Sequence, residues 1–434
     1  MVMAQIFERR RARRAAVFRV ECLDARQLLS LVGPTYPRDP HFGLEWGLNS
    51  ASDVDIDAPE AWSVTTGKAS TIVAVLDSGI DARNPEFAGR LWLNPSASRP
   101  GKPVYGWNFV GGNGDVRDDY GHGTHVAGIL GAAHDGRGIV GVDWNARIMP
   151  LKVLDANGSG TIRDTVDAIN FAVANGARVI NASWSIDEPD PALYNAIVHA
   201  GSRGVVFVTS AGNAGADLDA KPVYPAAYRL PNVIVVGAVD RSGNLADFSN
   251  HGASTVDVAA PGVDVYGTFA SRTGYATLSG TSMAAPHVTG VVSLLVGLHP
   301  EWSAEQLVQR VLATTKPLPG LAGKTATGGI VSAAGAVGGL GSGLGLISHQ
   351  AAAPPTTSSR VVARSIPALA PAPRPRPAPP PPVRAPIRRP PMPQRTAPPA
   401  LQKFAPPRLA RALPGMPLRL RAASLGAEPI SFMR

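Results

Sequence analysis

The chain has 434 residues, of which 44% are hydrophobic and 17% charged, and its formal net charge is +9. That charge belongs to the two ends, because residues 1–30 carry +4 and residues 350–434 carry +13, which leaves −8 for the residues between them. The basic charge therefore gives no indication of a nucleic-acid groove in the body of the chain, and we expect no nucleic-acid partner. The single cysteine, Cys22, lies near the N-terminus, and no stretch approaches the roughly 18 apolar residues that a transmembrane helix needs.

Composition divides the chain into three segments. Residues 1–35 contain an arginine cluster like the start of a secretory signal, but the apolar segment after it is short, so a disordered basic arm is the alternative. Residues 36–347 have the composition of one large folded domain. Residues 348–434 are dominated by Pro, Ala and Arg, which predicts a disordered tail of coil or polyproline II. A spacer or a contact with polyanions or the cell surface is the alternative for this tail.

In chain order, the body alternates predicted strands with predicted helices. Strands are expected at Thr71–Leu76, Arg147–Leu154, Arg178–Trp184, Gly204–Ser210 and Asn232–Val239. Helices are expected at Gly123–Ala133, Thr161–Asn175 and Pro191–Ser202, and in the apolar run Val288–Leu298. This alternation predicts a three-layer α/β fold, with a mostly parallel sheet and helices on both faces. Catalytic groups are expected at the carboxyl ends of its strands.

Three short motifs suggest nucleophilic catalysis. Ser282, in Gly-Thr-Ser, comes just before the apolar helix, whose positive end favours a developing oxyanion. His122 begins another predicted helix, and Asp77 ends the first strand. A serine hydroxyl needs a base, and the base needs a group to orient it. The chain order Asp, His, Ser therefore predicts a triad, although each residue alone could be an ordinary cap or strand end.

A fourth motif, Thr209-Ser210-Ala211-Gly212-Asn213, ends a strand with a side-chain amide that can donate to an oxyanion. Together with the motifs of Asp77, His122 and Ser282, it makes residues 36–337 resemble the subtilisin-like (subtilase) serine proteases. The resemblance implies the subtilisin-like fold and a serine endopeptidase in which Asn213 donates to the oxyanion. It also implies a monomer, secreted by or attached to the surface of a bacterium, that acts on protein or peptide substrates.

The resemblance further indicates where substrate binds. Ser183, Trp184 and Ser185 match the segment that forms one wall of the family's primary pocket, and Ser210 and Gly212 are also expected to contact substrate. Extended peptides bind such edges by adding a strand. Trp184 is bulkier than the family's usual residue, and Ser185 replaces a glycine. Because no buried acid is predicted there to select Lys or Arg, we expect broad, apolar-leaning specificity.

Calcium is the expected cofactor, in a structural role, and this too comes from the resemblance. Asp39, Glu86 and Asp135 fall on the family's main calcium site, and carboxylate oxygens are ligands that calcium prefers. Residues 108–119 could form a second site, but Gly111 stands where a ligand is expected, so a solvated acidic loop is the alternative. The family's usual inhibitory propeptide has no counterpart before residue 36, which leaves the folding route open.

Two other functions remain open at this point. An inactive subtilase could bind peptides or act as a scaffold, although all four catalytic residue types are present. A surface-attachment protein could instead use the C-terminal tail as its functional part.

Overall fold

The computed structural model describes residues 33–95, 104–338 and 431–432, and all of these belong to one compact unit of the chain. The leader predicted for residues 1–35 and the tail predicted for residues 348–434 therefore lie almost wholly outside the described residues. Ser431 and Phe432, which fall within the segment predicted to be disordered, form a strand.

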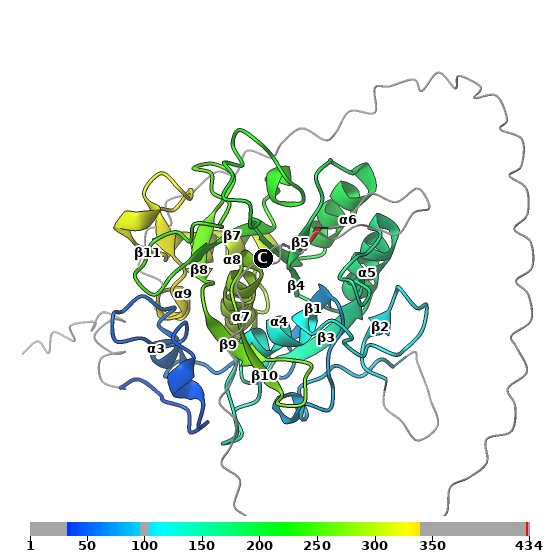
Figure 1. The fold of residues 1–434 in the computed structure, drawn as a ribbon, viewed down its shortest axis with the longest axis horizontal. Coiled ribbons are helices and arrows are strands. Elements are labelled where there is room, and N and C mark those ends of the chain that lie inside the picture. Colours follow the sequence, from blue (N-terminus) through cyan, green and yellow to red (C-terminus); the bar gives the residue numbers. More distant parts are fainter. Residues whose placement is uncertain (1–32, 96–103, 339–430, 433–434) are drawn as a thin grey trace, which may run out of the picture. The chain divides into compact units, whose positions relative to one another are not determined.

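The described elements carry the labels of Figure 1. The strands are β1 (Ile72–Asp77), β2 (Trp107–Asn108), β3 (Arg147–Lys152), β4 (Val179–Ala182), β5 (Trp184–Ser185), β6 (Val206–Ser210), β7 (Val233–Val239), β8 (Val258–Pro261), β9 (Val265–Thr268), β10 (Tyr275–Leu278), β11 (Lys316–Pro317), β12 (Gly329–Ile330) and β13 (Ser431–Phe432). The α-helices are α3 (Ala58–Trp62), α4 (His122–Gly131), α5 (Ile162–Ala174), α6 (Pro191–Ser202), α7 (Thr281–Leu298), α8 (Ala304–Ala313) and α9 (Ala333–Val337). Short 3₁₀ helices are η1 (Phe42–Leu44), η2 (Pro85–Phe87), η3 (Ala226–Tyr228) and η4 (Pro319–Leu321).

One nine-stranded sheet runs through the body in the order β11-β12-β8-β7-β6-β4-β1-β3-β2. Its neighbouring strands are parallel except for the antiparallel pair β11 and β12. Since parallel strands end at the same edge of a sheet, the carboxyl ends of β6, β4 and β1 are neighbours. Asp77 ends β1, Ser183 follows β4 and Asn213 lies just beyond β6. The sheet order thus brings distant parts of the sequence to one edge.

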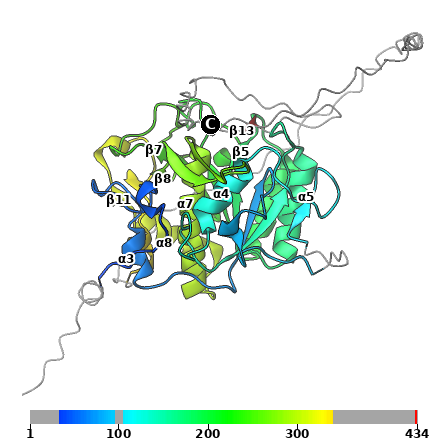
Figure 2. The ribbon, with the colours of Figure 1, turned by 60° about the horizontal axis from the view of Figure 1, so that its bottom comes forward.

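Helices cover both faces of this sheet. On β1, Val73 and Val75 belong to the apolar cluster that includes residues of α4 and α7, whereas Ala74 and Leu76 belong to the cluster of α5 and α6. Successive side chains of a strand point to opposite faces, so both faces are buried. Figure 2 shows α5 on the side of the sheet away from α7 and α8. The predicted three-layer fold with a mostly parallel sheet is confirmed.

The central helix, α7, begins at Thr281, well before the apolar run from which it was predicted. Ser282 is therefore the second residue of the helix and not part of a separate turn. Among the described helices, α7 alone is long and apolar enough to cross a membrane, but 94% of it is buried inside the body. It is thus placed as the core helix against which α4, β6 and β7 pack.

Candidate active site

Asp77 and His122 form a buried pair at the carboxyl end of β1. His122 Nδ1 lies 2.9 Å from Asp77 Oδ1 and 3.0 Å from Oδ2. The backbone N–H of Ser78 also donates to Asp77 Oδ1, at 2.7 Å. A carboxylate can only accept, so the proton of the neutral imidazole is held on Nδ1. That tautomer leaves Nε2 as the basic nitrogen of His122.

The N-terminus of α4, on which His122 stands, is fixed by Asp118. This carboxylate is 6% exposed and accepts from Gly121 N at 2.7 Å, Thr124 N at 2.8 Å and Thr124 Oγ1 at 2.6 Å. The hydroxyl of Ser78 donates to it as well, at 2.9 Å. An acid here pairs with the orphan N–H groups and the positive end of the helix. The sequence had predicted that Asp118 lies in a calcium-binding or solvated loop. Its position four residues before His122, the first residue of α4, is a sequence feature that could have indicated its role at the helix N-terminus.

Ser282 is fully buried in the first turn of α7 and is held against Ser183. Its hydroxyl lies 3.4 Å from the carbonyl oxygen of Ser183, and its own carbonyl accepts from Ser183 Oγ at 3.2 Å. That carbonyl would normally pair within the helix four residues on, but Pro286 stands there and has no N–H. Asn181 Nδ2 in turn donates to Ser183 Oγ at 3.0 Å. The proline thus leaves an acceptor that ties the nucleophile to the end of β4.

Asn213 presents a donor that nothing described satisfies. Thr281 N and Thr281 Oγ1 each lie 2.9 Å from Asn213 Oδ1. A backbone N–H can only donate, so the atom that faces it is the oxygen, and the amide nitrogen faces the other way. Asn213 Nδ2 is buried without a hydrogen-bond partner among the described residues. Such an atom is costly unless it has a task, and a transient anion would supply its missing partner.

The Trp184 side chain does not form a pocket wall in the segment that was predicted to bind substrate. The Trp184 side chain is 0% exposed, donates from Nε1 to the Leu76 carbonyl at 3.1 Å, and packs in the apolar cluster of α5 and α6. Its ring therefore fills the core beneath β5. Ser183 and Ser185, its neighbours, are also buried. Ser210 lies fully buried at the end of β6.

Gly212 has a separate role. Its N–H donates to Thr281 Oγ1 at 3.1 Å, and its φ of +110° is one that side chains rarely allow. The glycine therefore lets the chain turn between β6 and Asn213 while it is tied to the start of α7.

Comparison with known proteins agrees with this geometry. The subtilase family matches residues 68–342, more than half of the chain. The chain belongs to the subtilase family.

Three individual proteins illustrate this similarity. The chain is 40% identical over 286 residues to the thermophilic serine proteinase of Bacillus sp. (strain AK1), which covers 64% of this chain and 65% of that protein. It is 39% identical over 261 residues to thermitase of Thermoactinomyces vulgaris, which covers 60% of this chain and 85% of thermitase. A solved protease structure from Pseudoalteromonas arctica superposes with a TM-score of 0.61 at 30% identity, covering 69% of this chain and 98% of that one. The chain thus spans slightly less than two thirds of the first of these relatives.

The subtilase's predicted calcium residues come from three segments. Asp39 Oδ1 accepts from the backbone N–H groups of Asp135, at 3.2 Å, and Gly136, at 3.1 Å. The carboxylate of Asp135 is exposed and accepts from Arg137 N at 3.1 Å, so it turns back into its own loop. Glu86 is completely buried. The structure therefore places Asp39 and Glu86 as buried acids and Asp135 as a surface acid of the adjoining loop.

Each of the two buried acids has an oxygen that lacks a hydrogen-bond partner among the described residues, Asp39 Oδ2 and Glu86 Oε2. Burial raises the pKa of Glu86 to about 7, and the charges of Asp135 and Asp39 add to that shift. The other Glu86 oxygen accepts from the Tyr275 hydroxyl. Asp39 Oδ2 also lies 3.5 Å from Nε2 of His134. Buried carboxylate oxygens that lack hydrogen-bond donors and repel one another are a donor set that a hard cation such as calcium fits.

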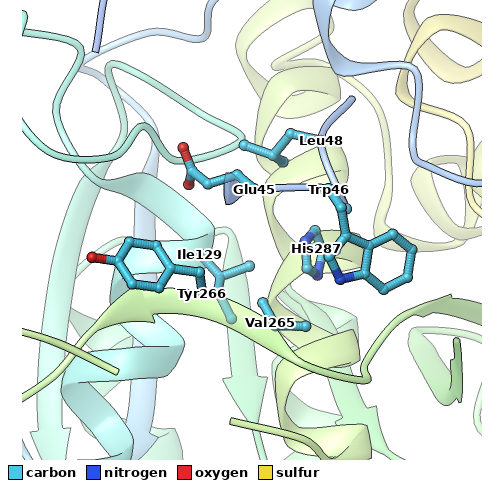
Figure 3. A pocket seen from close by; sticks show the side chains of 8 residues that line it. Glu45, Trp46, Leu48, Ile129, Val265, Tyr266 and His287 are labelled. Carbon is cyan, nitrogen blue, oxygen red and sulfur yellow. The ribbon is translucent and has the colours of Figure 1, made fainter. Parts of the chain in front are cut away.

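Glu45 is a further buried acid in this region, and the sequence analysis missed it. Burial raises its pKa well above the usual range, and the nearby charges of Glu86 and Asp39 act in the same direction. It borders a cavity of about 10 Å³, which is close to the space of one water molecule. Figure 3 shows Glu45 and His287 among the residues that line this cavity. No sequence spacing links Glu45 to Glu86, so only the fold could bring them together.

A separate acidic group lies in the N-terminal part of the described chain. Asp53, Asp55 and Asp57 are, among the described residues, the three whose side-chain oxygens lie within 4.8 Å of one another. The amino group of Lys316 is 2.5 Å from Asp57 Oδ1 and 3.4 Å from Asp53 Oδ1. A lysine therefore already supplies the positive charge in this group.

Proposed function

We propose that this subtilase is a serine endopeptidase that uses Asp77, His122 and Ser282 as its triad. The observation that carries the proposal is the pairing of an ordered Asp–His dyad with a buried, unsatisfied Asn213 donor at one edge of the sheet. A peptide-binding scaffold would have no use for either. The inactive-scaffold alternative is therefore the weaker candidate.

In the proposed reaction, Nε2 of His122 removes the proton of Ser282 Oγ as the oxygen attacks a peptide carbonyl. The carboxylate of Asp77 holds the Nδ1 tautomer and stabilises the imidazolium that forms. The same imidazolium then protonates the leaving amine. Water repeats the sequence on the acyl-enzyme and releases the second product.

The oxyanion is stabilised by Asn213 Nδ2 and by the Ser282 backbone N–H at the positive end of α7. Both are fixed in advance, because Thr281 holds the amide of Asn213 and the helix holds the backbone. A donor of this kind contributes on the order of 3 kcal/mol to lowering the barrier.

Substrate binds by adding a strand to β5 in this proposal. Because the Trp184 ring is turned into the core, the segment contributes mainly backbone hydrogen bonds, which are common to all peptides. We therefore propose broad, apolar-leaning specificity for protein and peptide substrates.

Calcium is proposed as a structural ion held by Asp39 and Glu86, with Asp135 in the adjoining loop as a further candidate. When bound, the ion would offset the charge of the buried acids and stabilise the N-terminal arm on the loop before β3. It takes no part in the proposed bond cleavage.

Secretion is proposed because the chain belongs to the subtilase family and its first residues contain an arginine cluster like the start of a secretory signal. We also propose that the enzyme acts as a monomer and that the basic segment beyond residue 347 contacts polyanions or the cell surface through its charge.

A casein-degradation assay with Ser282→Ala beside the unchanged chain tests the triad. We expect no detectable hydrolysis by the variant and an unchanged melting temperature. Comparable hydrolysis by both chains would overturn the proposal.

A further inference from the structure

The last described strand, β13, pairs with the edge at which substrate is proposed to bind. Ser431 lies opposite Ser185 and Phe432 opposite Trp184 in an antiparallel ladder. Figure 2 labels the two strands side by side. Among the described strands, β13 is the one that β5 pairs with. The substrate edge thus carries a strand from this chain's own C-terminus.

The direction of β13 is the one that a substrate needs. In an antiparallel pair, residue numbers rise along one strand as they fall along the other, so β13 runs from Ser185 to Trp184, in the direction of Ser183. The carbonyl oxygen of Ser183 lies 3.4 Å from the hydroxyl of Ser282. A peptide bound this way lies along β5 with its amino-side residues and leads its next carbonyls to the nucleophile.

The sequence at β13 suits an edge with an apolar preference. Residues 430–433 read Ile-Ser-Phe-Met, and Phe432 is one of only two aromatic residues between residues 348 and 434. Pro429 precedes the strand and so removes no donor from it. The rest of that segment is mainly Pro, Ala and Arg, which does not suit a β-ladder.

The length of chain between α9 and β13 permits this contact without strain. Residues 339–430 number 92, and a segment of that length is long enough to span several tens of ångströms whether it is coil or polyproline II. A tethered peptide on such a linker has an effective concentration on the order of 0.1–1 mM. Even a weakly bound C-terminus would therefore compete with free substrate.

We propose that the strand Ser431–Phe432 acts as a competing peptide that occupies the β5 edge of its own chain and weakens the binding of other substrates. The inference rests on the proposed function, because the edge is the substrate site only if Ser282 is the nucleophile. The inference goes beyond the peptidase activity, because it identifies the segment that occupies the edge in the absence of substrate.

The test compares the full chain with a variant that ends at Ile430 and with the double variant Ser431→Pro/Phe432→Pro, which removes whichever backbone N–H of the two-residue strand faces β5. Both should lower KM for a short peptide substrate about 2- to 10-fold with kcat unchanged, because the competitor is lost. Ala423→Pro, outside the ladder, is the matched control and should leave KM unchanged. A synthetic peptide of residues 428–434 should inhibit the shortened enzyme competitively.

Equal KM values for all four chains would overturn the inference while leaving the peptidase assignment intact. A KM difference that disappears on dilution would also overturn it, because the occupant would then be a second copy. In the Ser282→Ala background, a labelled substrate peptide should bind the shortened chain about 2- to 10-fold more tightly than the full chain. That readout stands even if hydrolysis is absent, and equal affinities would refute the inference.

Discussion

The catalytic edge and the buried acidic region under the N-terminal arm contain unsatisfied atoms of opposite kinds. At the edge, Asn213 Nδ2 is a donor without an acceptor among the described residues. Under the arm, Asp39 Oδ2 and Glu86 Oε2 are acceptors without a hydrogen bond from the described residues, although His134 Nε2 lies 3.5 Å from Asp39 Oδ2. A buried polar atom without a partner costs stability, so each region is built for a charge that it does not itself contain. One region suits a transient anion, and the other suits a permanent cation.

The difference lies in how long the missing partner stays. An oxyanion exists only during the reaction, so its donor must wait in position, and the neighbours of Asn213 hold it there. A metal ion remains bound, so acids that repel one another can be tolerated in the ground state. Mutations at the catalytic edge should therefore mainly lower the reaction rate. Mutations in the acidic region should mainly lower the stability of the fold.

The largest effect should come from removing the nucleophile or its base. Ser282→Ala and His122→Ala should each lower kcat by about 10⁶-fold, and the double variant should be scarcely worse than either, because the residues act as one unit. The related subtilisin shows losses of this size. Rates measured with a chromogenic peptide, with calorimetry as the control for folding, test this. Additive losses would show that the two residues act separately.

Asn213 offers the next largest effect and a matched pair of variants. Asn213→Ala should lower kcat by about 10²- to 10³-fold with little change in KM, because the donor acts only in the transition state. Asn213→Asp keeps an oxygen for Thr281 but loses the donor and adds a negative charge. It should therefore keep the stability and lose at least as much rate. Equal loss of stability and unchanged kcat in both variants would move Asn213 to a purely structural role.

Removal of calcium by a chelator should lower the stability of the protein, because the acidic region loses its cation. If calcium at a hundred times its dissociation constant binds only the folded state, its removal costs about 2.7 kcal/mol of unfolding free energy. Calorimetry with and without chelator should show a lower Tm, with the initial rate changed much less. Glu86→Gln should reduce the chelator effect, and Asp187→Asn, an exposed acid elsewhere, is the control. If the chelator leaves the Tm of the parent chain unchanged, calcium does not stabilise this protein.

The smallest effect concerns a buried histidine behind the catalytic edge. Burial lowers the pKa of His287 to about 4, below its usual 6.5, while its Nδ1 donates to the Met283 carbonyl at 2.9 Å. The unfolded chain therefore takes up a proton between pH 6.5 and 4 that the folded chain does not, so stability falls as pH falls through this window. From pH 7 to 5.5 the loss should be about 1 kcal/mol.

Denaturant unfolding at the two pH values, with His287→Gln compared with the parent, measures this contribution. The parent should lose more stability than the variant. His125, whose pKa burial lowers to about 3, acts in the same direction in both chains and cancels in the difference. Equal pH dependence of the two chains would contradict the prediction.

The sequence by itself determined the layered α/β fold, and it was sufficient to predict which residues carry catalytic chemistry. Apolar strands alternating with amphipathic helices can bury both faces of a parallel sheet in few other ways, so the fold follows from the pattern. The Asp77, His122, Asn213 and Ser282 motifs are local, and their residue types carry chemistry wherever the chain takes them. Local chemistry and periodicity are what a sequence states directly.

The tertiary structure alone decided how those groups are held and what surrounds them. The side of the sheet that the Trp184 ring enters depends on strand register, which no local pattern fixes. Glu45 became a buried acid because its hydrogen-bond partner Val140 and the neighbouring acid Glu86 lie on other segments. The pairing of Phe432 with Trp184 joins two positions that are far apart in the sequence. Long-range contacts of this kind arise from the packing of the whole chain, and for that reason the sequence alone could not specify them.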